Sequence, residues 1–260
     1  MANSAITAEN VYQRFPELEP LTSTSNPGKL SASESDLSGY DAQQAQLMNE
    51  VCIVVDSFDT PIARASKHAC HLMKNINAGL LHRAFSCFLF NSRNELLLQQ
   101  RADAKITFPG LWTNTCCSHP LDIPGEVGDD FAGAVEGVKR AAQRKLQQEL
   151  GIKPEQVPIK DFEFLTRVHY LAGDGKWGEH EVDYILFIRA EVDVDANPNE
   201  IKDMRWVSPE QLRGMLEDTS LKYTPWFQRI CEGLLFKWWD SLGAPEFDKY
   251  KEETEIRRML

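Results

Sequence analysis

The order of predicted elements in this 260-residue chain indicates an α/β fold, a mixed β-sheet with helices packed on its faces. Three observations predict it. Short apolar runs typical of buried strands occur at 51–55 and 84–90. An amphipathic helical pattern follows between 130 and 151. Further strand-like segments then precede an aromatic-rich helical region at 224–241.

The first half of the chain predicts strands. Val51 to Val55 is apolar and ends at Asp56, as expected for a buried strand. Ala84 to Phe90 predicts a second strand, which the polar turn Asn91 to Asn94 joins to a third strand, Glu95 to Arg101. A polar turn between two such runs is typical of a hairpin.

The second half predicts one long helix, more strands and terminal helices. Gly151 lies where a helix C-cap glycine is expected, and Ser208-Pro209 is a favourable helix start. Strands are expected near 162–170, near 181–190 and at 205–207. The apolar positions of the long helix recur at helical spacing: Val135, Val138, Ala142, Leu146 and Leu150.

Composition limits the class of protein. Hydrophobic residues make up 42% and the net charge is −11, which suits a globular core and argues against a broad nucleic-acid-binding surface. Adjacent Cys116-Cys117 is a poor disulfide pair, so reduced thiols are expected. No apolar run approaches the length that a membrane span needs. A cytoplasmic location is therefore expected. Residues 1–45 predict a flexible extension, 46–245 the catalytic domain and 246–260 a charged tail or helix.

Two short stretches carry candidate chemistry. In Thr113 to Pro120, Cys117 lies two residues from His119, and an imidazolium or a metal lowers a thiol's pKa. An inert buried cysteine is the ordinary alternative, and in an extended segment only Cys117, not Cys116, shares a face with His119. In Trp177 to Glu181, Glu179 and Glu181 would point the same way. Taken alone, that pair suggests an exposed acidic strand end.

Histidines could extend this set. His71 and His82, together with His119, Glu179 and Glu181, would suit a divalent cation such as zinc, manganese or iron. A single histidine is more often structural, and spacing alone leaves the convergence of these five residues open.

Cations occur close by in the sequence. Lys67 precedes His71 by four residues. Arg101 ends the predicted third strand, and Lys105 follows four residues later. Such side chains are normally solvated. Grouped beside metal ligands, they could bind a phosphate or a diphosphate.

The end of the long helix resembles a degenerate Nudix box. Arg144, Leu146, Glu149 and Gly151 match that pattern. Lys145 and Gln148 stand where the box has glutamates, and a fifth match, Glu136, lies at its upstream glutamate position. Loss of two carboxylates argues against hydrolysis but is compatible with the fold, and Glu149 could still hold one Mg²⁺ on a substrate diphosphate.

Together these motifs resemble the type 1 isopentenyl-diphosphate delta-isomerases of the eukaryotic kind, from about Leu47 to Asp240. The resemblance rests on segments that occur in the same order: Cys70-His71-Leu72, Leu80 to Phe85, Ile106 to Gly110, Thr113 to Pro120, Trp177 to Glu181, Thr224-Pro225-Trp226 and Phe236 to Trp239.

The resemblance implies a Nudix-type α/β/α sandwich, the reversible conversion of isopentenyl diphosphate to dimethylallyl diphosphate in isoprenoid biosynthesis, and a monomer. It implies Mg²⁺ on the substrate diphosphate and one divalent metal, Zn²⁺, Mn²⁺ or Mg²⁺, in the protein. The implied roles are Cys117 and Glu181 as acid/base groups with Tyr170 assisting; His71, His82, His119, Glu179 and Glu181 as metal ligands; Glu149 as the Mg²⁺ ligand; Lys67, Arg101, Lys105 and Ser118 at the diphosphate; and Trp226 over the hydrocarbon.

Two other functions fit parts of the sequence. A Nudix-type diphosphate hydrolase is the second choice, weakened by the missing glutamates. A structural metal-binding protein is the third choice. Structural zinc sites are usually closed by cysteines and histidines at tight local spacing, whereas the candidate ligands here are far apart in the sequence and include glutamates.

Overall fold

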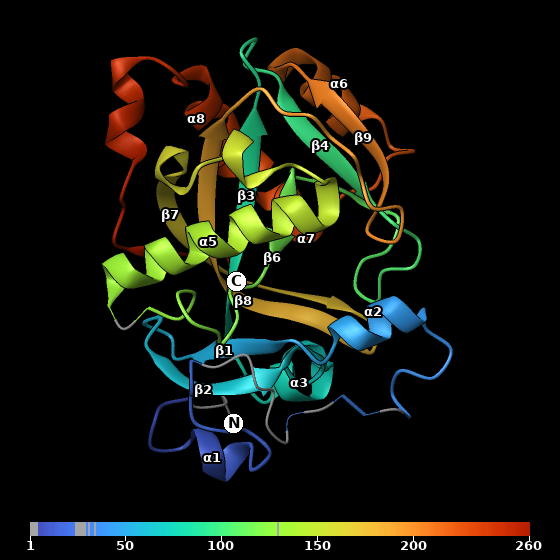
Figure 1. Cartoon of the computed structure of the whole chain (residues 1–260), viewed down its shortest axis with the longest axis vertical. Coiled ribbons are helices and arrows are strands. Elements are labelled where there is room, and N and C mark those ends of the chain that lie inside the picture. Colours follow the sequence, from blue (N-terminus) through green and yellow to red (C-terminus); the bar gives the residue numbers. More distant parts are fainter. Residues whose placement is uncertain (1–4, 24–29, 31, 34, 129) are drawn as a thin grey trace.

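The computed structural model describes residues 5–23, 30, 32–33, 35–128 and 130–260, and within them one ten-stranded mixed sheet lies between two sets of helices (Figure 1). The helices are α1 (Val11–Arg14), α2 (Ala42–Leu47), α3 (Lys67–His71), α4 (Met73–Asn77), α5 (Phe131–Leu150), α6 (Pro209–Glu217), α7 (Pro225–Ile230) and α8 (Phe236–Asp240), with a π-helical turn at Cys231–Leu235 and 3₁₀ turns at Pro154–Gln156, Ile159–Asp161 and Pro245–Tyr250. The strands are β1 (Val51–Val55), β2 (Pro61–Ser66), β3 (His82–Phe90), β4 (Leu96–Arg101), β5 (Trp112–Thr113), β6 (Cys116–Ser118), β7 (Glu163–Asp174), β8 (Trp177–Arg189), β9 (Ile201–Val207) and β10 (Ile256–Arg258).

Helix α5 covers one face of the sheet, and the C-terminal helices cover the other (Figure 1). The apolar side of α5 joins the first core with β1 and β3, whereas α7 and α8 pack with β4 and β7 in a second core. This is the predicted sandwich of helices on both sheet faces. Helix α5 also begins and ends as predicted, because Asp130 caps the backbone N–H of Gly133 and Gly151 adopts a left-handed φ of 66°.

The predicted strands are present, with one difference in pairing. Strand β1 has the predicted bounds, but β3 and β4 pair only at Phe90 and Leu96 beside the turn. Beyond that point β4 pairs with β9, while β3 runs parallel to β8 and antiparallel to β6. The predicted hairpin therefore opens after a single residue pair. The opening places β3 between β6 and β8, the strands that carry Cys117 and Glu181.

The N-terminal extension is not separate from the domain. Val11 and Phe15 are buried in the first core, and Glu19 forms a β-bridge with Arg64 of β2. Ordered structure therefore begins well before residue 46, where the catalytic domain was expected to begin. The few apolar residues of an otherwise polar segment bury themselves against the β1–β2 side of the sheet. The predicted flexibility of residues 1–4, 24–29, 31 and 34 lies outside the described residues.

The C-terminus also joins the sheet. After the 3₁₀ turn at 245–250, strand β10 pairs in parallel with β7, where Arg258 lies opposite His169. The sequence predicted a tail or a helix here, because a three-residue strand is too short to show an alternating pattern. In the described parts of the chain, no helix combines the length and the apolar character that a membrane span requires.

Candidate active site and metal centre

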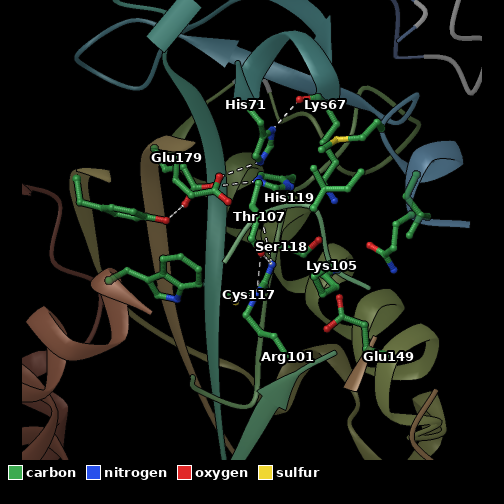
Figure 2. A pocket seen from close by; sticks show the side chains of 17 residues that line it. Lys67, His71, Arg101, Lys105, Thr107, Cys117, Ser118, His119, Glu149 and Glu179 are labelled. Carbon is green, nitrogen blue, oxygen red and sulfur yellow. Dashed lines mark hydrogen bonds and ion pairs between the residues drawn. The ribbon is translucent and has the colours of Figure 1, made fainter. Parts of the chain in front are cut away.

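One pocket gathers almost all the candidate residues (Figure 2). It lies at the ends of β3, β6 and β8 and is closed from the side by α2. Of the thirteen residues singled out from the sequence and the family resemblance, His82 alone is not in its lining. The lining residues are Gln44, Leu47, Met48, Lys67, His71, Arg101, Lys105, Ile106, Thr107, Cys117, Ser118, His119, Glu149, Tyr170, Glu179, Glu181 and Trp226.

Five side chains form the histidine–glutamate cluster: His71, His82, His119, Glu179 and Glu181. All five are buried, and each offers one ligand atom within 4.8 Å of the others. They come from the end of α3, the start of β3, the residue after β6, and β8. The sheet therefore brings together residues that the sequence left apart, and the open question of their convergence is answered by the geometry.

The contacts within the cluster are short. His119 Nε2 lies 2.9 Å and His82 Nε2 3.2 Å from the same oxygen of Glu181, and His71 Nε2 lies 2.8 Å from Glu179 Oε2. Every pair of the three imidazole rings has centroids 4.9 Å apart. Burial, reinforced by the neighbouring histidines, holds the pKa of His119 well below its usual range. His119 is therefore neutral and can act as a ligand.

The cluster fits a divalent cation. Buried nitrogens of His71, His82 and His119 and one oxygen of Glu179 make no well-directed hydrogen bond, although His71 Nε2 and Glu179 Oε2 lie at ion-pair distance from each other. Such atoms are costly unless something binds them. His71 is also oriented for the purpose, because its Nδ1 contacts the carbonyl of Lys67 at 2.6 Å and its Nε2 faces the cluster. Three imidazoles and two carboxylates are a donor set that zinc, manganese and iron accept.

Cys117 forms the wall opposite β8. In β6 the side chains alternate as predicted: Cys117 lines the pocket, whereas Cys116 is fully buried with Sγ 3.6 Å from Glu149 Oε2. Cys117 Sγ lies 3.9 Å from the Arg101 guanidinium and 4.0 Å from the Thr113 hydroxyl. Burial raises the pKa of Cys117 to about 12, against the opposing effect of Arg101. The group is therefore a protonated thiol in this environment.

Glu181 and its neighbours form the facing wall. The Tyr170 hydroxyl donates to Glu181 Oε2, and these residues lie opposite each other in the β7–β8 pairing. Burial, together with the Glu181 charge, raises the pKa of Tyr170 well above its usual value. The Trp226 ring lies 6.0 Å from the Tyr170 ring and donates its Nε1–H to Asn114. His180, between the two glutamates on β8, points away and contacts the Leu80 carbonyl.

The remaining side of the pocket is cationic. Lys67, Arg101 and Lys105 line it, and Ser118 and Glu149 complete it (Figure 2). The Arg101 side chain donates to the carbonyls of Thr107 and Phe108, which holds the loop between β4 and β5 against the pocket. Glu149 Oε1 lies 3.1 Å from Lys145 Nζ, and both side chains are buried.

Sequence reasoning missed two parts of the site. Helix α2 contributes Gln44, Leu47 and Met48 to the pocket, and its signal was the Asp41 cap before a run of good helix formers. Asp183 lies two residues beyond Glu181 on β8, accepts a hydrogen bond from the Ser86 hydroxyl and is buried. Burial and the Glu181 charge hold the pKa of Asp183 well above its usual value. Asp183 could have been predicted, because every second residue of a strand faces the same side and the series Glu179, Glu181 continues to Asp183.

Comparison with known proteins agrees with this geometry. Residues 80–227 match the NUDIX domain. An isopentenyl-diphosphate delta-isomerase of Aspergillus fumigatus is 60% identical over 98% of this chain and 96% of its own length. The chain belongs to the isopentenyl-diphosphate delta-isomerases. A family member from Gibberella zeae is 58% identical over 99% of this chain and 97% of its own, and one from Mus musculus is 54% identical over 87% and 99%.

The fold of this isomerase family is the Nudix fold. The solved structure of DR0079 from Deinococcus radiodurans superposes with a TM-score of 0.50, at 15% identity, over 72% of this chain and 100% of that protein. The predicted Nudix-type α/β/α class is confirmed. The NUDIX match and the buried histidine–glutamate cluster together support the binding of a divalent metal.

Proposed function

We propose that this protein interconverts isopentenyl diphosphate and dimethylallyl diphosphate. The observation that carries the proposal is the placement of Cys117 and Glu181 on β6 and β8, the two strands that flank β3, so that both line one pocket. The reaction adds a proton to one carbon and removes one two carbons away. Two proton-handling groups on different walls of a narrow pocket match that requirement.

Each group is equipped for proton transfer. Cys117 is a protonated thiol beside Arg101, whose charge would stabilise a thiolate. Burial opposes ionisation of Glu181, but contacts with His82 and Tyr170 lower its pKa, so it is a carboxylate that can accept a proton. In the reverse direction the two groups exchange roles as acid and base. Tyr170 fixes the orientation of Glu181.

The hydrocarbon would lie against Trp226. Protonation of the alkene develops positive charge on a tertiary carbon, and an aromatic face attracts a cation. Trp226 is held in place by Asn114 and by edge-on packing with Phe108, with ring centroids 5.4 Å apart. Burial of this region keeps water away from the developing charge.

The diphosphate would bind at the cationic side. Lys67, Arg101, Lys105 and Ser118 face the same part of the pocket, with Glu149 available to a Mg²⁺ ion on the diphosphate. Binding energy from this remote end would position the alkene between the two walls. A Zn²⁺, Mn²⁺ or Mg²⁺ ion in the histidine–glutamate cluster would supply positive charge that keeps Glu179 and Glu181 ionised at close range. One chain provides all these residues, so the proposed site is complete within a monomer.

The test is incubation with isopentenyl diphosphate in heavy water, followed by NMR. Isomerisation predicts deuterium in the newly formed methyl group. Release of phosphate or monophosphate would instead indicate a Nudix-type hydrolase. No change in the substrate would contradict both activities.

A further inference from the structure

Lys105, one of the cations at the proposed diphosphate site, is held by a residue outside that site. Its Nζ donates to Glu200 Oε2 at 2.6 Å. Glu200 is 4% exposed and immediately precedes β9. The Glu200 carbonyl also accepts the Ala102 N–H at 2.9 Å, so side chain and backbone both fasten the loop that carries Lys105.

The second oxygen of Glu200 accepts a hydrogen bond from a residue of the N-terminal extension. Gln44 of α2 donates its Nε2–H to Glu200 Oε1 at 3.0 Å and also to the Asn199 side chain at 2.7 Å. Gln44 is buried and lines the pocket. The series Gln44, Glu200 and Lys105 thus connects α2 to the cationic side of the pocket.

We propose that Glu200 and Gln44 are positioning residues, which hold the Lys105 ammonium group charged and directed at the substrate diphosphate. The inference rests on the proposed function, because it assumes that Lys105 binds the diphosphate. It adds that the N-terminal extension takes part in the site through Gln44.

The electrostatics explain why Lys105 needs this partner. Burial lowers the pKa of Lys105, and Glu200 opposes that effect more strongly than any other neighbour. Burial would raise the pKa of Glu200, but Lys105 and Lys145 lower it to about 2, so its negative charge is permanent at neutral pH. The other charged groups that face this pair are Arg101 on β4, Lys67 on α3, Glu149 and Lys145 on α5, and Glu50 before β1, which is paired with Lys67.

These neighbours set the sign of the expected effect. Arg101 and Lys67 disfavour the Lys105 charge, so replacing Glu200 by glutamine lets Lys105 lose its proton at a lower pH. A neutral amine attracts a diphosphate weakly. The affinity of Glu200→Gln for inorganic diphosphate should therefore fall below that of the wild type as the pH rises. At low pH, where Lys105 is charged in both proteins, Glu200→Gln should bind diphosphate at least as tightly as the wild type, because it lacks a negative charge near the anion.

The experiment is calorimetric titration with inorganic diphosphate and Mg²⁺ at several pH values between about 6 and 9. Glu200→Gln should lose about tenfold in affinity at the upper end, because a neutral Lys105 no longer makes a charge-assisted contact with the diphosphate. In the isomerase assay its KM should rise while kcat is retained. A Glu200→Gln protein with the wild-type pH dependence of diphosphate affinity would overturn the proposal.

Gln44→Leu provides a second variant with a matched control. It removes the donor to Glu200 and should weaken diphosphate binding about threefold, less than Glu200→Gln because the charge remains. Gln43 is exposed on the same helix, so Gln43→Leu should bind like the wild type. Equal effects of Gln44→Leu and Gln43→Leu would overturn the role of Gln44.

A double-mutant comparison separates the two proposals. In a Lys105→Met background, adding Glu200→Gln should cause no further loss of diphosphate affinity, because Glu200 acts through Lys105. Additive losses would overturn the positioning role and leave the proposed function intact. If Lys105→Met alone bound diphosphate normally, the assignment of Lys105 to the diphosphate site would fail first.

Discussion

Two buried charged clusters in this molecule differ in how their charges are matched. In the Asp59 cluster (Asp59, Arg83, Arg167 and Tyr184), Asp59 accepts Arg83 Nε–H at 2.8 Å, an Arg167 N–H at 3.0 Å and the Tyr184 hydroxyl. The histidine–glutamate cluster is equally buried, but several of its nitrogens and one oxygen have no hydrogen-bond partner. Both oxygens of Asp59 are paired within the protein, although Arg167 Nε has no hydrogen-bond partner, whereas the second cluster leaves ligand atoms from three imidazoles and one carboxylate available to a cation.

This difference indicates which cluster serves structure and which serves function. Asp59 joins the β1–β2 turn to β3 and β7 through ion pairs with Arg83 and Arg167, and to β8 through the Tyr184 hydroxyl, without a ligand. The histidine–glutamate cluster places two carboxylates and three imidazoles within 4.8 Å at the pocket wall. Crowding of this kind destabilises a fold unless a cation is bound. Substitutions in the two clusters should therefore affect different properties.

The largest expected effect is on the rate. Cys117→Ala should lower kcat by about 10²–10⁴-fold, because it removes an acid/base group from the pocket. Its thermal stability should change little, since the thiol lies at the pocket surface. Cys116→Ala, the matched control on the other face of β6, should retain most of the activity. Steady-state assays of both variants measure this difference in kcat. An equal loss of kcat in the two variants would refute the assignment of Cys117 as the acid/base group.

The next largest effect should be on stability alone. Asp59→Asn leaves Arg83 and Arg167 buried with a neutral partner and should cost about 3–5 kcal/mol in the free energy of unfolding. The folded fraction should keep its kcat. Urea denaturation measures the loss, with Asp240→Asn, an exposed aspartate at the end of α8, as the control. A fall in kcat without a loss of stability would reverse the roles of the two clusters.

Chelation should distinguish the clusters without a mutation. Removal of a bound divalent cation should abolish isomerisation and lower the melting temperature by about 5–10 °C, as expected for a ligand near 100-fold above its Kd. Asp59→Asn should still show this shift, whereas His71→Ala should not. A chelator-induced shift of equal size in His71→Ala would place the cation elsewhere.

The smallest expected effect concerns Glu200. The Lys105 and Lys145 charges lower the pKa of Glu200 from 4.5 to about 2, even though burial opposes ionisation. The stabilisation from this ion pair is therefore complete above the unfolded-state pKa and is lost as the pH falls from about 4.5 toward 2. It should amount to about 2 kcal/mol, measured as the difference in acid denaturation between the wild type and Glu200→Gln. Parallel curves for the two proteins in that range would contradict the pairing.

Much of the sheet could be predicted from sequence because its strands are local apolar patterns. Strand β1 and helix α5 were predicted almost residue by residue, since five consecutive apolar residues and helical spacing are strong signals. The pairing of β3 and β4 at a single residue pair was not predictable, because β4 pairs along its length with β9, a strand distant in the sequence, and not with β3, which precedes it. Strand β10 and helix α2 are too short to carry a periodic pattern.

The site was predicted as residue types and assembled only by the fold. Alternation correctly placed Cys117 on the face of His119, and Glu179 on the face of Glu181. The glutamate pair taken alone suggested an exposed strand end, and this was wrong, because both side chains are buried. The convergence of His71 and His82 depends on the end of α3 meeting the start of β3, which no local spacing reveals. Gln44 and Glu200 were missed because each is an ordinary polar residue until long-range packing brings it to Lys105.

The most direct test of the difference between the two clusters is the metal content of the purified protein. Elemental analysis of the wild type and of Asp59→Asn should give one tightly held divalent metal per chain. The double variant His71→Ala/Glu179→Gln should contain far less under the same dialysis. Equal metal content in that variant, or a wild type without metal that gains none when zinc, manganese or magnesium is supplied, would contradict the assignment of the histidine–glutamate cluster as the metal centre.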